Sequence, residues 1–320
     1  MRRIPFVTSI IAVATVLSMA VAFATPPSGD LKYTDLYRAQ FTDSASVPIV
    51  GGTVLMQAAY DIESGGQTGW RRLPGTAVFS VGLGKLMIHG GEGCAAKEYA
   101  PGQAAVLPAG VYQFHNPAAE GTEDGQVSFW GLFFQMAPDA AEPLVDGPPQ
   151  DAPATCSGVS GQAVSAPSGV HVKGKSAGTF VNSYGDSHAH HAGHDASHDP
   201  NTVTIEAGKD IFATLYDAAP GWSSGWFQHV PAVNIMHKGD LTYYEGRDGQ
   251  CVKTETYHAG ESFYHPTHNH MAVNEGKEHV LITSIYIGMP HDEKPPPVVG
   301  NQAGAADFSQ PPPEGCSRLR

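Results

Sequence analysis

The apolar residues of this chain fall in short runs, and glycine or proline separates one run from the next. Short apolar runs with turn residues between them predict many β-strands rather than long helices. Several runs, such as Thr242–Tyr244 and Ser284–Tyr286, are rich in β-branched and aromatic residues, which favour strands. The pattern therefore predicts an all-β protein, folded as a sandwich or a barrel.

The predicted strands form two groups with a less regular segment between them. The first group comprises Val54–Tyr60, Ala77–Val81, Leu86–His89, Ala104–Leu107 and Ser128–Phe134. The second comprises Ile211–Tyr216, Val233–Met236, Leu241–Glu245, Ser262–Tyr264 and Val280–Ile287. Further strands are predicted at Val170–Val172 and Thr179–Val181, and a short helix at Asp35–Phe41. Two groups of this kind indicate two domains, each with its own core.

Residues 69–136 and residues 225–288 carry the same landmarks in the same order. The offset between the two copies is about 155 residues, a period too long for a short-repeat solenoid. The shared landmarks are Gly-Trp (69–70 and 225–226), a glycine before a strand (Gly84 and Gly239), a cysteine (Cys94 and Cys251), a Tyr-x-x-Gly turn (99–102 and 257–260) and an asparagine (Asn116 and Asn274). The sequence therefore predicts a duplicated domain.

These landmarks resemble the two sequence motifs of the cupin superfamily. The first motif, G-x5-H-x-H-x(3,4)-E-x6-G, aligns with residues 69–84 and 225–239, and the second, G-x5-P-x-G-x2-H-x3-N, aligns with residues 102–116 and 260–274. The resemblance covers most of residues 50–136 and 208–290. It implies two tandem jelly-roll (cupin) β-barrels with a loop-rich connector, an arrangement called a bicupin.

The repeat and the resemblance divide the chain into five expected segments. They are a signal peptide (1–24), an N-terminal barrel (25–150), a connector rich in Gly, Ser and His (151–207), a C-terminal barrel (208–294) and a Pro-rich tail closed by a disulfide (295–320).

In cupins, three histidines and a glutamate point into the barrel and hold one divalent metal, often Mn, Fe, Ni or Zn. The first copy has lost these ligands, because Arg71, Leu73, Val78 or Phe79, and Tyr112 stand at the corresponding positions. No metal is therefore expected in the N-terminal barrel. We interpret Arg71 as a surface charge at a strand end, and carboxylate binding is the alternative.

The second copy keeps part of the metal set. His229 and His270 match two of the family's histidines, whereas Phe227 replaces another, and Val233 or Asn234 replaces the glutamate. Imidazole donors suit Mn, Fe, Ni or Zn, so one such divalent metal is a candidate cofactor of the C-terminal barrel.

A third histidine ligand is needed to complete the site. His268 lies two residues before His270, and on a strand both side chains face the same way. We therefore predict that His229, His268 and His270 bind the metal with one position open. His265 is expected beside them, as a residue that supports the ligands.

An alternative use of these histidines is hydrogen bonding within a small-molecule pocket. The residues expected to line that pocket are Trp226, Phe227, Tyr243, Phe263, Tyr264 and Asn274. A separate cluster lies in the connector and is predicted to capture metal only weakly. It consists of His188, His190, His191, His194 and His198.

The N-terminus predicts export. Arg2 and Arg3 precede an apolar run from Ile10 to Val21, and the small residues around Ala24 form a cleavage site. We therefore expect a secreted or periplasmic protein without a stable membrane anchor, the alternative being an uncleaved anchor. The formal net charge of −13 argues against nucleic acid and anionic membranes as partners.

Four cysteines suit an oxidising compartment and allow three pairings. Cys94 and Cys251 occupy matching places in the two copies, and Cys156 and Cys316 each follow one copy. If each copy is a domain, the repeat favours Cys94–Cys156 and Cys251–Cys316, with free thiols as the alternative.

Two functions are consistent with the sequence. The first is a secreted bicupin that binds a small polar ligand, a divalent metal or both in its C-terminal barrel, without catalysis. The second is a metal-dependent cupin enzyme, of oxygenase, decarboxylase or isomerase type, that uses His229, His268 and His270. The sequence contains no phosphate loop, dinucleotide fingerprint or Gly-x-Ser-x-Gly elbow, and no substrate follows from the fold.

Overall fold

The computed structural model describes residues 28–90, 94–119, 125–148, 150–156, 167–181, 201–247 and 250–292, together with Pro312 and Cys316. The described chain is all-β, with a short 3-10 helix at Ala154–Cys156. The predicted signal peptide, the histidine-rich cluster at 188–198 and most of the tail lie outside the described residues. Among the described residues, no helix has the length and apolar character needed to cross a membrane.

The observed strands include every strand predicted from the apolar runs. They are β1 (Leu31–Phe41), β2 (Ala45–Pro48), β3 (Val54–Leu73), β4 (Ala77–Leu83), β5 (Leu86–Gly90), β6 (Ala96–Tyr99), β7 (Gln103–Leu107), β8 (Gly110–His115), β9 (Val127–Met136), β10 (Ser168–Phe180), β11 (Thr202–Ile205), β12 (Asp210–Ala218), β13 (Ala232–Lys238), β14 (Asp240–Arg247), β15 (Gln250–His258), β16 (Glu261–His265), β17 (His270–Val273) and β18 (Val280–Met289). The helix predicted at Asp35–Phe41 is wrong, because these residues belong to β1 and pair along β12. Strand pairing therefore outweighs the weak local preference of this segment.

The N-terminal barrel is built from two facing sheets. One has the strand order β3-β9-β4-β7, and the other has the order β3-β8-β5-β6. The long strand β3 contributes to both sheets, its first part pairing with β9 and its last part with β8. Apolar side chains between the sheets, including Phe79, Phe114 and Phe129, form the core of this barrel.

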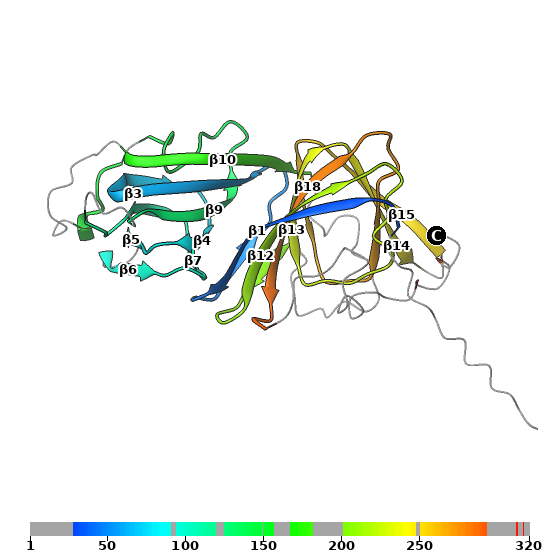
Figure 1. Ribbon diagram of the computed structural model, residues 1–320, viewed down its shortest axis with the longest axis horizontal. Helices are drawn as coiled ribbons and strands as arrows, with labels where there is room; N and C mark the ends of the chain where they lie inside the picture. Colours follow the sequence, from blue (N-terminus) through cyan, green and yellow to red (C-terminus); the bar gives the residue numbers. More distant parts are fainter. Residues whose placement is uncertain are drawn as a thin grey trace, which may run out of the picture.

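The C-terminal barrel repeats the same strand order. Its sheets are β12-β18-β13-β16 and β17-β14-β15, and bridges at Ser223↔Val273 and Phe227↔His270 add the segment before β13 to the second sheet. Two facing sheets in this order form a double-sheet jelly roll. The two barrels lie side by side in Figure 1. The strand order therefore confirms two jelly-roll barrels.

The two copies also share hydrogen bonds. The side-chain amide of Asn116 donates to the carbonyl of Ile62 (3.0 Å), and that of Asn274 donates to the carbonyl of Ala218 (3.0 Å). In both copies the asparagine side-chain oxygen accepts the backbone N–H two residues later, also at 3.0 Å. Gly69 and Gly225 have the same left-handed φ of 67°, which glycine adopts without steric cost. The repeated glycine and asparagine residues therefore form the same turns and the same hydrogen bonds in both copies.

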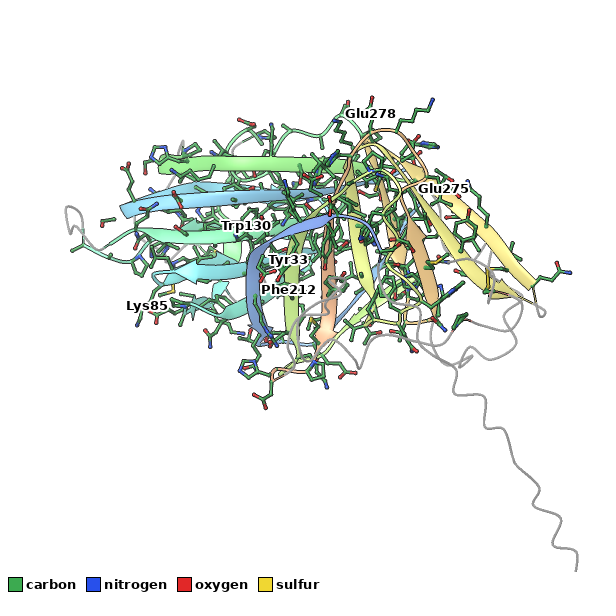
Figure 2. All side chains as sticks on the ribbon, turned by 45° about the vertical axis from the view of Figure 1, so that its right-hand side comes forward. Tyr33, Lys85, Trp130, Phe212, Glu275 and Glu278 are labelled. Carbon is green, nitrogen blue, oxygen red and sulfur yellow. A yellow bond between two sulfur atoms is a disulfide. The ribbon has the colours of Figure 1, made fainter. Side chains whose placement is uncertain are left out.

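Two strands cross between the barrels. Strand β1, within the range expected for the N-terminal barrel, pairs antiparallel with β12 of the C-terminal barrel, and its end pairs with β7. Strand β10, within the range expected for the connector, pairs antiparallel with β3, and its end pairs with β16. Tyr37 of β1 stacks on Trp130 of β9, with ring centroids 5.3 Å apart. Trp130 is labelled in Figure 2. These pairings join both barrels in one 13-stranded sheet.

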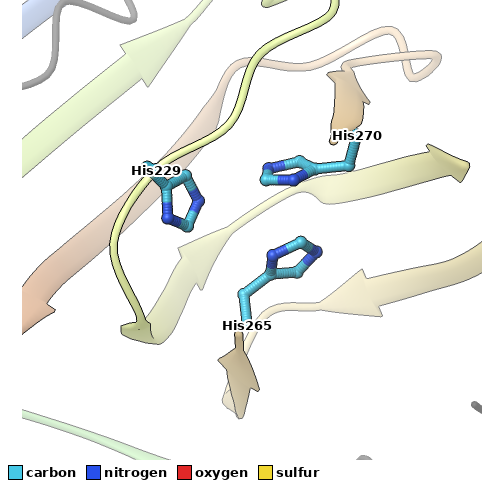
Figure 3. A group of neighbouring side chains, drawn as sticks. All are labelled: His229, His265 and His270. Atoms are coloured by element: carbon cyan, nitrogen blue, oxygen red, sulfur yellow. The ribbon is translucent and has the colours of Figure 1, made fainter. Parts of the chain in front are cut away.

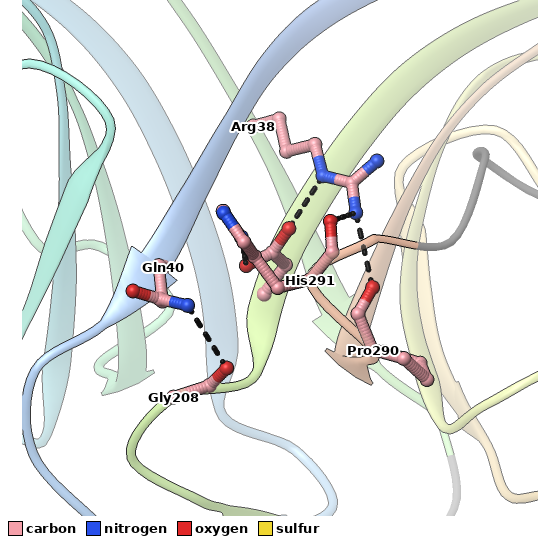
Figure 4. Close-up of polar contacts among 6 residues, drawn as sticks. Arg38, Gln40, Gly208, Pro290 and His291 are labelled. Carbon is pink, nitrogen blue, oxygen red and sulfur yellow. Dashed lines mark hydrogen bonds and ion pairs between the residues drawn. The ribbon is translucent and has the colours of Figure 1, made fainter.

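A polar cluster fastens β1 to the C-terminal barrel (Figure 4). Arg38 Nε lies 2.5 Å from a carboxylate oxygen of Asp210, and Arg38 Nη2 donates to the carbonyls of Pro290 (3.1 Å) and His291 (2.7 Å). The second oxygen of Asp210 lies 2.9 Å from His291 Nδ1. Asp210 is buried, so this pairing compensates for the removal of its charge from water.

The cysteines pair as the repeat favoured. The sulfur atoms of Cys94 and Cys156 lie 1.97 Å apart, and those of Cys251 and Cys316 lie 2.30 Å apart. Each bond joins one copy to the segment that follows it. Cys316 is buried in a small cluster with Trp226 and Met271, on the outside of the C-terminal barrel wall.

Candidate metal centre

Three buried histidines converge inside the C-terminal barrel (Figure 3). His229 lies in the segment that leads into β13, His265 ends β16, and His270 begins β17. Each offers one ring nitrogen, and these three atoms lie within 4.8 Å of one another. The strand order of the jelly roll brings these positions together, since β16 and β17 belong to opposite sheets.

Backbone carbonyls fix the orientation of two of these rings. His229 Nδ1 lies 2.5 Å from the carbonyl of Val230, and His270 Nδ1 lies 2.9 Å from the carbonyl of His268. A carbonyl can only accept, so Nδ1 carries the hydrogen in both rings and Nε2 is left as a lone-pair donor. His270 Nε2 is buried and has no hydrogen-bond partner. A buried acceptor of this kind fits a metal ligand, whose other nitrogen is usually held by such a carbonyl.

Burial keeps these imidazoles neutral. Loss of hydration lowers the pKa of His229 from 6.5 to about 4, although its bond to the Val230 carbonyl acts in the opposite direction. Burial also lowers the pKa of His270 well below its usual range, and the neighbouring histidines add to this effect. Both rings are therefore neutral at pH 7, the form in which histidine binds metals.

His268 and Glu245 form a second group beside the first. His268 Nε2 lies 2.7 Å from a carboxylate oxygen of Glu245, and its Nδ1 lies 3.1 Å from the carbonyl of Pro266. Both nitrogens of His268 thus face acceptors. Glu245, His265 and His268 also offer ligand atoms within 4.8 Å of one another, so His265 belongs to both groups.

The structure assembles a different third histidine from the one predicted. His265, expected as a supporting residue, lies in the triad with His229 and His270, whereas His268 lies against Glu245. The strand argument for His268 does not hold, because β17 begins only at His270. The alternation of side chains along a strand therefore does not extend back to residue 268.

Glu245 was missed by the sequence reasoning. It lies on β14 directly opposite His270 of β17, and it is buried. A signal for it was available, because Tyr243 was expected in the pocket and Glu245 follows two residues later on the same strand. Strand alternation then places both side chains on the same face.

A small cavity of about 30 Å³ lies beside His229. Of the residues predicted for the pocket, Phe227 and Tyr243 line it. Trp226 packs against Cys316 on the other side of the wall, and Tyr264 packs in the core shared with the N-terminal barrel. Phe263, also predicted for the pocket, packs in the barrel core and does not line the cavity. The side chain of Asn274 donates to the carbonyl of Ala218 and does not line the cavity either.

The same positions in the N-terminal barrel carry different side chains. Leu73 and Tyr112 correspond to His229 and His270, and Leu107 corresponds to His265; all three belong to the apolar core. Gly90 pairs with Tyr112 as Glu245 pairs with His270. A Cβ on Gly90 would lie 2.4 Å from the ring of Tyr112, so that ring occupies the place of an acidic side chain. These residues provide no nitrogen or carboxylate donor.

Arg71 is buried, and its interpretation as a surface charge is wrong. Its Nε donates to the carbonyl of Leu144 (3.1 Å), and burial lowers the pKa of its guanidinium while the Glu142 charge raises it. Glu142 is also buried and accepts the backbone N–H groups of Leu144 and Val145, both at 2.7 Å. Arg71 therefore holds the segment after β9 against the barrel.

The fold and the site together define a two-barrel jelly-roll protein with a histidine cluster in its second barrel. No family model matches the chain, and no curated protein matches it. Among solved structures, the chain is similar to oxalate decarboxylase from Bacillus subtilis at pH 4.6, with 14% identity over 80% of this chain and 77% of that chain and a TM-score of 0.32.

Two further structures of oxalate decarboxylase give similar values. One, which concerns its Mn(II) centres, has 13% identity over 81% of this chain and 79% of that chain, with a TM-score of 0.31. The other, which concerns the substrate binding mode and reaction specificity of an oxalate decarboxylase, has 12% identity over the same shares, with a TM-score of 0.33. Both the identities and the TM-scores are too low to transfer any property of that enzyme to this chain.

Proposed function

We propose that this protein is an exported bicupin that binds one divalent transition metal in its C-terminal barrel. The ligands in this proposal are His229, His265 and His270, and the metal is Mn, Fe, Ni or Zn. The observation that carries it is the buried Nε2 of His270, which has no hydrogen-bond partner and belongs to a ring held by a carbonyl. Three imidazole ligands leave a coordination position open.

Glu245 and His268 have a supporting role in this proposal. Their mutual hydrogen bond of 2.7 Å places one carboxylate beside the triad, where it offsets part of the positive charge of a bound metal. Because His268 Nε2 faces Glu245 and its Nδ1 faces the Pro266 carbonyl, this ring is directed away from the three-histidine group.

Titration of the purified protein with Co²⁺ tests the assignment of the third ligand. His265→Asn is expected to weaken binding by more than about tenfold and to change the visible absorption of the bound ion, whereas His268→Asn is expected to cost less. His258→Asn serves as a control, because His258 is an exposed histidine paired with Asp240. Equal loss in His258→Asn and His265→Asn, or loss only in His268→Asn, would contradict this ligand set.

A metal-dependent enzyme is the second candidate, and the cavity beside His229 favours it. A substrate in that cavity would reach the open position of the metal. Oxygen uptake by the Fe²⁺-loaded protein in the presence of a cavity ligand, compared with His270→Asn, tests the oxygenase form of this candidate. Equal uptake by both proteins would exclude it.

Export is supported by the two disulfide bonds, which form and persist outside reducing compartments. Expression of the full chain in a bacterial host, followed by mass determination of the mature protein, tests this part. We expect a chain that begins close to Thr25 and contains no free thiol. A chain that retains Met1 and reacts with a thiol reagent would contradict export.

A further inference from the structure

We infer that the outer face of the N-terminal barrel carries a binding site for one Cu⁺ ion, formed by Met87 and His89 of β5 and His115 of β8. This site is separate from the metal centre of the proposed function and does not depend on it. It also lies outside the interior of its own barrel, where the positions that correspond to the metal ligands have no donor.

The alternation of side chains along β5 and β8 places the three ligands on one face of the sheet. The core of the barrel takes every second residue of these two strands, namely Leu86, Ile88, Tyr112 and Phe114. Met87, His89 and His115 stand at the intervening positions, so their side chains lie on the outer face. All three are partly exposed, which agrees with this placement.

Strand pairing makes the three ligands neighbours within that face. Met87 lies directly opposite His115 in the antiparallel pair of β5 and β8, and His89 follows Met87 two residues later on β5. Side chains that are directly opposite have Cβ atoms about 5 Å apart, and diagonal neighbours remain within reach of long side chains. The rings of His89 and His115 are stacked, with centroids 4.9 Å apart and an angle of 20° between their planes.

One nitrogen of the histidine pair points to a missing ligand. His89 Nδ1 is buried and has no hydrogen-bond partner among the residues that the structure describes. Buried polar atoms are normally paired, and an unpaired imidazole nitrogen is a lone-pair donor or an N–H without an acceptor. A metal ion bound to this nitrogen would provide the partner.

Both rings are in the form that binds metals. Burial lowers the pKa of His89, and burial together with the neighbouring His89 lowers the pKa of His115. The two imidazoles are therefore neutral at pH 7, so they stack without charge repulsion and need not release a proton to bind a metal.

The donor set selects Cu⁺ over harder cations. A thioether is a soft donor that favours Cu⁺, and imidazole also binds copper. The carboxylate of Glu98, which lies opposite Met87 on β6, is paired with Lys85 at 2.8 Å. The amides beside the histidines are paired as well, since Gln113 donates to the side-chain oxygen of Gln67. Two imidazoles and one thioether remain, which is a poor set for Zn²⁺.

The second copy shows that the fold does not require these three residues. The pair Thr242 and Val273 stands at the positions of Met87 and His115, because Glu245 pairs with His270 as Gly90 pairs with Tyr112. By the same register, Tyr244 stands at the position of His89. Tyr244 and Val273 pack against the cluster that contains Cys316. The outer face of the second copy therefore has a packing role and carries no histidine or methionine at these positions.

Anaerobic competition for Cu⁺ between the protein and the chelator bicinchoninate tests the inference. The full chain with residues 187–199 deleted is used, so that the histidine-rich cluster cannot contribute. We expect His89→Asn and His115→Asn each to weaken the binding of one Cu⁺ at least about tenfold. His258→Asn is the control, because His258 is an exposed histidine on the other barrel, and it should leave the affinity unaltered. Zn²⁺ is expected not to compete.

Met87→Leu tests the thioether, because it keeps the volume of the side chain and removes the sulfur. The X-ray absorption spectrum of the bound copper should show a sulfur neighbour in the unmodified protein and none in Met87→Leu. Thermal unfolding without metal shows that each variant is folded.

The same titration of a chain that carries both His229→Asn and His270→Asn separates this site from the metal centre of the C-terminal barrel. We expect this chain to keep the Cu⁺ site. Equal Cu⁺ affinity in His89→Asn, His115→Asn and the unmodified protein overturns the inference, and so does loss of Cu⁺ binding only in the chain without His229 and His270. A sulfur neighbour that persists in Met87→Leu, or displacement of Cu⁺ by Zn²⁺, contradicts the proposed ligands.

Discussion

His265 and His268 show how far single residues can be placed from the sequence. The second cupin motif located His270, and the first located His229, because the glycines that anchor these motifs set the positions of the turns. The choice between His265 and His268 depended on where β17 begins, and strand boundaries are the part of a sequence reading that is least certain. Strand alternation from Tyr243 could have placed Glu245 on the pocket face, but its position opposite His270 depends on the pairing of β14 with β17.

At the residue scale, we predict that His229 makes the metal-free protein less stable as the pH falls. The pKa of His229 is about 4 in the folded protein and 6.5 in the unfolded chain, so the unfolded state binds more protons between pH 4 and pH 6.5. The free energy of unfolding should therefore fall by about 1.4 kcal/mol per pH unit below pH 6.5, with a further fall in the same direction from His270. Urea unfolding in the presence of a chelator, at several pH values, measures this slope.

His229→Gln removes the titrating group and serves as the comparison in that measurement. The variant should have a shallower slope between pH 6.5 and 4 than the unmodified protein. Equal slopes in the two proteins would show that the His229 ring is hydrated and not buried as described.

At the element scale, the crossing strand β1 is the feature that the sequence analysis misassigned, because Asp35–Phe41 was predicted as a helix. Its position before the first copy suggested the N-terminal barrel, but its partner β12 begins about 170 residues later in the chain. The strands within each copy were easier to predict, because the alternation of apolar and polar residues and the turn residues are local features of the sequence. The connector strand β10 was recognised only in part, since its glycines and lysines weaken the apolar pattern.

We predict that Arg38→Met lowers the free energy of unfolding by about 3 kcal/mol, because it leaves the buried carboxylate of Asp210 without its guanidinium. Lys85→Met is a matched control, since Lys85 and Glu98 form an exposed ion pair that is expected to contribute less than about 1 kcal/mol. Denaturant unfolding of the three proteins at one pH provides the comparison. An equal effect of both substitutions would contradict the role assigned to Arg38.

At the scale of the whole molecule, the duplication explains the architecture, and the crossing strands explain why the two barrels form one unit. Each barrel includes a strand that lies outside the repeated stretch. Strand β1 pairs with β12 of the C-terminal barrel, and β10 pairs with β3 of the N-terminal barrel. The repeat predicted the two barrels and their disulfides. The exchange of strands could not be predicted, because both β1 and β10 lie outside the repeated stretch.

We predict that the barrels unfold together. Calorimetry of the full chain should give a single transition, with a calorimetric enthalpy close to the van't Hoff enthalpy. A fragment of residues 208–294 lacks β1 and exposes the edge of β12, so it should aggregate unless a peptide of residues 28–43 is added. Two separate transitions, or a fragment that folds alone, would contradict this prediction.

The central claim is that the C-terminal barrel holds one metal through His229, His265 and His270. The most direct measurement is metal analysis by mass spectrometry of the full chain with residues 187–199 deleted, so that the histidine-rich cluster cannot contribute. The account predicts about one equivalent of a divalent transition metal, and less than about 0.1 equivalent when His229 and His270 are both replaced by asparagine. An unaltered metal content in the double variant, or no metal in the deletion protein after incubation with Zn²⁺, would contradict it.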